Sequence, residues 1–156
     1  LQFVPHIVMP FAAILVVCAY TTANPTGVGG DKALHRERGP KGIVGITRHP
    51  LLVGIALWAG AHMIVNGDAA SLAFFGGFLL TALVGTVSID AKLKAREPEA
   101  FDRLAAVTSI IPFAAVMQGR ARIRWSEISW WRPAVGIALY AALYLGHPYI
   151  AGVSLH

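Results

Sequence analysis

The sequence predicts an all-α, polytopic transmembrane helical bundle. Hydrophobic residues make up 56% of the 156 residues and charged residues 13%, and the charges fall in blocks separated by long neutral runs, as is typical of a bilayer protein. Four apolar stretches approach the about 20 residues that a helix needs to cross the hydrocarbon core. These four predicted spans are residues 3–20, 51–65, 70–89 and 133–153.

The distribution of positive charge predicts the topology. All 13 Lys and Arg residues lie in segments 21–48 and 90–132, and none lies in the connection 66–69. With four spans, both basic segments are on one side, and the positive-inside rule makes that side cytoplasmic. Membrane sorting and attraction to anionic lipid headgroups therefore explain the net charge of +5, so we expect membrane lipid rather than nucleic acid as the partner.

The second basic segment contains a predicted amphipathic helix on the cytoplasmic surface. Pro98 suits the first turn of a helix, and Glu99 and Asp102 suit its positive end. Phe101 and Leu104 begin an apolar stripe at helical spacing that continues through 105 and 108. Three tryptophans then precede the last predicted span, where an aromatic belt at the membrane interface is expected. These are Trp125, Trp130 and Trp131.

Three histidines fall at one depth in the predicted bundle. Counted from the span ends at the helical rise, His6, His62 and His147 lie roughly 6–8 Å inside the non-cytoplasmic boundary. An imidazole in the hydrocarbon zone indicates a functional site, and these residue types are compatible with ligation of haem iron between helices. The alternative is that each ring only forms hydrogen bonds across helices.

His62 and His49 are predicted to do different work. Trp58 offers an aromatic wall one turn before His62, and Ala59 offers a gap, so a flat ligand would fit there. His49 follows Arg48 and precedes Pro50 at the cytoplasmic edge. This pair has two interpretations: a helix start with a headgroup anchor, or a binding site for an anionic cofactor group such as a propionate or phosphate.

The stretch "GITRHPLLVGIALWAGAHMIVNGDAASLAFFGGF", with "EAFDRLAAVTSIIPFAAVMQGR" and "WWRPAVGIALYAALYLGHPYIAGVSL", strongly resembles the NnrU family, which includes 15-cis-zeta-carotene isomerases. The resemblance covers nearly the whole chain and implies a single NnrU-like membrane domain over residues 1–156, lacking one or more N-terminal helices. It also implies a multi-pass protein of the bacterial inner membrane.

In the isomerase branch the resemblance implies haem b, with an iron ligand that falls on His62 and a second ligand upstream of residue 1. Where that branch carries a cysteine three residues before the histidine, this chain has Ala59. The expected activity is isomerisation of a cis double bond in a carotenoid-like polyene. The NnrU branch is instead associated with denitrification, which implies an accessory or assembly subunit of a larger membrane redox complex.

A more distant resemblance connects the chain to isoprenylcysteine carboxyl methyltransferases. It rests on "RHP" followed by Gly54, and on the helix ending in "SIIP". It implies an S-adenosylmethionine site at the cytoplasmic edge around Arg48, His49 and Arg103. Asp90 and Ala91 stand about where that family has a pair of acidic residues, which leaves the site incomplete. Methyl transfer is thus the third functional hypothesis, beside the isomerase and the accessory subunit.

Overall fold

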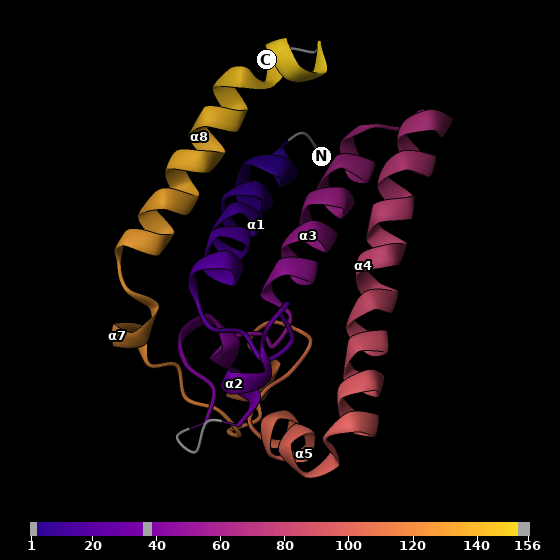
Figure 1. The fold of residues 1–156 in the computed structure, drawn as a ribbon. Helices are drawn as coiled ribbons and strands as arrows, with labels where there is room; N and C mark the ends of the chain where they lie inside the picture. Colours follow the sequence, from indigo (N-terminus) through magenta and orange to yellow (C-terminus); the bar gives the residue numbers. More distant parts are fainter. Residues whose placement is uncertain (1–2, 36–38, 153–156) are drawn as a thin grey trace.

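The computed structural model describes residues 3–35 and 39–152, and every regular element in these two ranges is helical. The four long helices are α1 (Phe3–Thr21), α3 (Pro50–Val65), α4 (Ala69–Arg96) and α8 (Trp131–Ala151). They lie side by side in the order α8, α1, α3, α4 (Figure 1). Helix α1 therefore occupies the middle of the arrangement, with α3 on one side and α8 on the other.

Three of these helices are long and apolar enough to cross a membrane: α1, α4 and α8. The sequence predicted a fourth span at 51–65, but α3 has 16 residues and a length of about 24 Å, less than the about 30 Å of the hydrocarbon core. Pro50 fixes its start, and the chain leaves helical geometry at Asn66. Helix α3 nevertheless runs between α1 and α4 (Figure 1).

The bounds of the other long helices follow from local chemistry. Helix α4 begins at an N-cap, where the Asp68 carboxylate accepts a hydrogen bond of 2.9 Å from the Ser71 backbone N–H. It continues seven residues beyond the predicted end at residue 89, because residues 91–96 are mostly good helix formers and Pro98 is the first residue that prevents continuation. Helix α8 ends at Gly152, which has a φ of 69°, a conformation that glycine adopts without strain.

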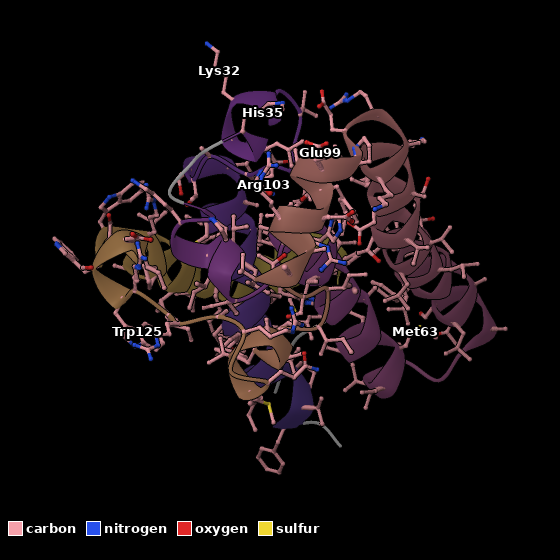
Figure 2. All side chains as sticks on the ribbon, turned by 90° about the horizontal axis from the view of Figure 1, so that it is seen from below. Lys32, His35, Met63, Glu99, Arg103 and Trp125 are labelled. Carbon is pink, nitrogen blue, oxygen red and sulfur yellow. The ribbon has the colours of Figure 1, made fainter. Side chains whose placement is uncertain are left out.

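The short helices are gathered at one end of the long ones. They are α2 (Asp31–Leu34), η1 (Gly42–Gly45), α5 (Pro98–Ala106), α6 (Ala114–Met117) and α7 (Trp125–Ile128). Figure 1 shows α2, α5 and α7 at this end, and Figure 2, seen from below, shows Lys32, His35, Glu99 and Arg103 on the same face. The two basic segments therefore share one end of the molecule, as predicted; we call it the basic end.

Helix α5 confirms the predicted amphipathic helix. Ala100 and Leu104 are buried, and Phe101 packs against the core. The Arg120 guanidinium closes the end of the helix, because its Nη1 donates hydrogen bonds to three carbonyl oxygens that no longer have helical partners. Those acceptors belong to Ala105, Ala106 and Thr108.

The buried core joins the long helices to the basic end. Its members come from α1, α3 and α4 and from the segments at the basic end, and include Leu15, Cys18, Val44, Val53, Leu93 and Leu104. In contrast, many large apolar side chains farther along α4 and α8 are exposed, for example Leu80 (64%) and Leu145 (72%). Exposed apolar surface of this extent is what a lipid environment would cover.

Candidate functional site

A cavity of about 680 Å³ lies between α1, α3 and α8, within the range of about 300–1,000 Å³ that is usual for ligand sites. Apolar and aromatic side chains form most of its wall. The residues that line it are Phe3, Pro5, His6, Met9, Ala12, Ala13, Val16, Gly54, Ile55, Trp58, His62, Val65, Asn66, Leu139, Tyr140, Leu143, Tyr144 and His147.

The three histidines that the sequence placed at one depth all line this cavity, each from a different helix. The ring centroids of His62 and His147 are 6.5 Å apart, with 20° between the planes. The His6 ring meets Tyr144, one turn before His147, edge to face at 5.6 Å. The structure therefore brings His6, His62 and His147 together at the end of the cavity where α1 begins.

The ring of His62 is held in one orientation. Its Nδ1 lies 2.8 Å from the carbonyl oxygen of Trp58, so Nδ1 carries the proton and donates to that oxygen. The ring also stacks on Phe75 at 4.6 Å and 24°, and the Trp58 ring lies 5.1 Å away. This arrangement leaves the lone pair on Nε2, and a histidine binds a metal through the ring nitrogen that carries the lone pair.

The aromatic wall predicted at Trp58 is present, whereas the gap predicted at Ala59 is not. Ala59 is fully buried and is not one of the residues that line the cavity. Small residues elsewhere on the wall, Ala12, Ala13 and Gly54, lie where α1 and α3 meet. A β-carbon on Gly54 would come within 3.1 Å of the Ala12 carbonyl oxygen, so a larger residue at position 54 would collide with α1.

Sequence reasoning missed the polar residues that accompany the histidines. Tyr140 and Tyr144 line the cavity from α8, and they precede His147 by seven and three residues, which puts all three on one helix face. That spacing was a signal that could have identified them. Asn66 also lines the cavity, and its side-chain amide donates a hydrogen bond of 2.9 Å to the backbone carbonyl of His62.

Arg48 and His49 lie elsewhere, at the basic end, where both contact Asp90 of α4. The His49 Nε2 is 2.8 Å from the Asp90 Oδ1, and the Arg48 Nε donates to the two carboxylate oxygens at 3.1 and 3.0 Å. The His49 side chain is 1% exposed. Neither residue lines the cavity; both belong to a buried ion-pair cluster, which we call the RHP cluster (Arg48, His49 and Asp90).

The RHP cluster also fixes the backbone around it. The Arg48 N–H donates to the Ser109 carbonyl at 3.0 Å, the Thr47 hydroxyl donates to the Ile110 carbonyl at 2.7 Å, and the Arg48 guanidinium lies 5.9 Å from the centre of the Phe101 ring. The segment before α3 is thereby tied to α4, α5 and the loop that follows α5. The structure shows the helix start, with Pro50 in the first turn of α3; a headgroup anchor and a bound anion at Arg48 and His49 both stay predictions.

A metal held by protein ligands alone is not indicated. Within residues 3–35 and 39–152, no three His, Cys, Asp or Glu side chains are grouped closely enough to hold an ion. The cavity wall contributes imidazoles but no carboxylate and no thiol. Such a donor set suits a metal whose other ligands come from a bound cofactor, as in haem.

Fold and cavity together define a polytopic α-helical membrane protein with a histidine-lined site between its helices. The chain belongs to the NnrU family, because the family model described as "NnrU protein" matches residues 1–155. The resemblance seen in the sequence is thus confirmed.

Two related proteins are 15-cis-zeta-carotene isomerases of chloroplasts. The chain is 39% identical to the Zea mays protein over 82 residues, or 53% of this chain, and 34% identical to the Arabidopsis thaliana protein over 116 residues, or 72% of this chain. The matched segments cover 22% and 32% of those two proteins, so the relationship is distant and partial. No solved structure matches the chain.

Proposed function

We propose that the protein binds haem b in the cavity between α1, α3 and α8, with His62 as an axial ligand, and isomerises a cis double bond of an apolar polyene. One observation carries this proposal: three histidines from three helices line a single, mostly apolar cavity. The distant homology to two zeta-carotene isomerases supplies the reaction type and the substrate class.

The donor chemistry of the cavity fits haem. His62 offers an Nε2 lone pair because its Nδ1 donates to Trp58, and Trp58 and Phe75 restrain the ring. A neutral imidazole whose other nitrogen is hydrogen-bonded is the usual haem ligand. The cavity has no Lys or Arg in its wall, so the polar side chains of Asn66, Tyr140 and Tyr144 are the lining groups that could donate hydrogen bonds to haem propionates.

The wall of the cavity suits a hydrocarbon substrate. Met9, Val16, Leu139 and Leu143 provide apolar contact, and the small side chains of α1 leave room. A conjugated hydrocarbon has no polar group to bind, so shape and apolar contact must orient it. When bound, haem supplies the iron centre at which the double bond changes configuration, while the side chains of this chain hold the polyene and exclude water.

An accessory role is the second candidate, supported by the exposed apolar face of α8. In that case α8 would contact another membrane protein, and the cavity would hold haem without admitting a substrate.

Methyl transfer is less well supported, because His49 is buried against Asp90 rather than open to a cofactor. We place the protein in the bacterial inner membrane, with the basic end cytoplasmic.

The deciding experiment is to feed a zeta-carotene isomer with a cis central bond, in the dark, to cells that express the intact protein. We expect conversion to the trans isomer with the wild-type protein and none with His62→Ala. The matched control is His35→Ala, because His35 is exposed at the basic end, and it should convert as the wild type does. Retained haem without conversion would refute the isomerase and favour the accessory role.

A further inference from the structure

We infer that a second cavity, at the basic end, binds the phosphate group of an anionic membrane lipid. This cavity of about 270 Å³ lies between the loop that precedes α2 and the last turns of α4. It shares no lining residue with the histidine-lined cavity, so the inference is independent of the proposed function. Two basic side chains and a glycine-rich loop form most of its wall.

The positive charge of the wall comes from one face of α4. Lys92 and Arg96 both line the cavity, about 6 Å apart along the helix, and side chains of these two types are the usual phosphate binders in proteins. Within the described residues Lys92 forms no ion pair, whereas Lys94 is paired with Asp102. The charge of Lys92 is therefore available to a ligand.

The loop presents backbone rather than side chains to the cavity. Gly27, Gly29 and Gly30 line it, and residues without a side chain allow the backbone to approach a ligand closely. A β-carbon at Gly30 would lie 2.3 Å from the Asn24 carbonyl oxygen, so the loop closes only with glycine at this position. The buried Asn24 side chain fixes the turn, because its Oδ1 accepts a hydrogen bond of 3.1 Å from the Thr26 backbone N–H.

The negative charge on the same part of α4 is already compensated. Asp90 belongs to the RHP cluster, in which the Arg48 Nε donates to it at 3.0 Å and the His49 Nε2 lies 2.8 Å away. Its carboxylate is thus satisfied from within the protein and opposes an anion at Lys92 only weakly.

The position of the cavity along α4 indicates a lipid as the source of the phosphate. Ile89 also lines the cavity, and it is the last residue of the apolar run predicted to cross the membrane. From Ile89 to Arg96 the helix rises about 10 Å, which extends the cavity from the edge of the hydrocarbon core into the headgroup layer. Basic pockets on the cytoplasmic side of membrane proteins bind anionic headgroups at this depth.

The size of the cavity argues against a nucleotide or another large soluble phosphate. Sites for drug-sized ligands usually enclose about 300–1,000 Å³, and this cavity, at about 270 Å³, is smaller. A headgroup phosphate with its glycerol needs less room, because the acyl chains stay in the bilayer.

The test is lipid binding by the delipidated intact protein in a neutral detergent, measured by native mass spectrometry with phosphatidylglycerol and, for comparison, zwitterionic phosphatidylcholine. We expect the wild type to prefer phosphatidylglycerol. Lys92→Gln should weaken its binding about five-fold, the usual contribution of one basic residue near anionic headgroups, and Lys92→Arg should restore it. Lys94→Gln is the matched control, because it removes the same charge two residues away and should leave the affinity unchanged.

Soluble competitors distinguish a lipid from a free phosphate. We expect inorganic phosphate and glycerol phosphate, each at the concentration of the lipid, to leave phosphatidylglycerol bound. Displacement of the lipid by either competitor would overturn lipid as the source. Equal weakening in Lys92→Gln and Lys94→Gln, or no preference for phosphatidylglycerol in the wild type, would overturn the site itself, because binding would then depend on net charge or on acyl chains alone.

Discussion

In the RHP cluster, buried basic side chains at the membrane edge are paired with a carboxylate. Arg48 and His49 would be costly to bury alone, but Asp90 reaches both from α4, with side-chain exposures of 11%, 1% and 12% for Arg48, His49 and Asp90. The partners are 41 and 42 residues apart in the sequence. The resemblance to the methyltransferases put Asp90 in the same region as Arg48 and His49, but no local signal in the sequence predicted the ion pairs that it forms with both.

Asp90→Asn should therefore destabilise the protein strongly, because removal of one member of a buried ion pair leaves the others unpaired. We expect a loss of about 3 kcal/mol in the free energy of unfolding, measured by thermal or denaturant unfolding in detergent. Asp102→Asn is the matched control. Its pair with Lys94 is exposed, at 61% and 48%, so the loss should be below about 1 kcal/mol. Equal losses in the two variants would refute a buried cluster.

At the scale of elements, local sequence predicted most helix boundaries. Prolines, caps and the switch from apolar to polar residues are local signals, and the predicted 3–20 became Phe3–Thr21. One boundary was wrong: the end of α4 was taken as the end of its apolar run, although helix formation does not require apolar residues. The fourth span stays a prediction, because the 16 residues of α3 are fewer than the about 20 of a full span.

Contact between α1 and α8 depends on a glycine. A β-carbon at Gly136 would lie 2.7 Å from the Ile14 Cα, which is backbone and cannot move aside alone. Gly136→Ala should therefore separate the two helices and cost about 1–3 kcal/mol. Gly146→Ala, on the same helix, meets only the Ile150 Cδ1 at 3.6 Å and should be neutral or stabilise by up to about 1 kcal/mol. Unfolding of both variants side by side checks this; equal stability would contradict the packing.

For the whole molecule, positive charge distinguishes one end from the other. Both basic segments share an end (Figure 1), and position 122 lies in one of them, whereas position 68 lies in the connection without Lys or Arg. A protein whose single cysteine is at position 68 should therefore be labelled from one side of the membrane, and one whose single cysteine is at position 122 from the other side. Cys18 is fully buried, and Cys18→Ser provides the background. Labelling of both positions from one side would contradict both the topology and the crossing of α4.

The histidine layer was predictable at this scale because depth follows from counting residues along helices. What the sequence could not provide was which helices are neighbours. The packing of α1 between α3 and α8 brings His62 and His147 to 6.5 Å, and that order depends on close contacts such as those at Gly54 and Gly136. Ala59 was misplaced for the same reason, because its burial against other helices cannot be read from its own turn.

The central claim is that the cavity between α1, α3 and α8 binds haem through His62, and the pyridine haemochrome of the purified intact protein tests it most directly. The prediction is a b-type haemochrome in the wild type, retained in His35→Ala and lost or strongly reduced in His62→Ala. Well-folded wild-type protein without haem, or His62→Ala with a full complement of haem and an unchanged spectrum, would contradict it.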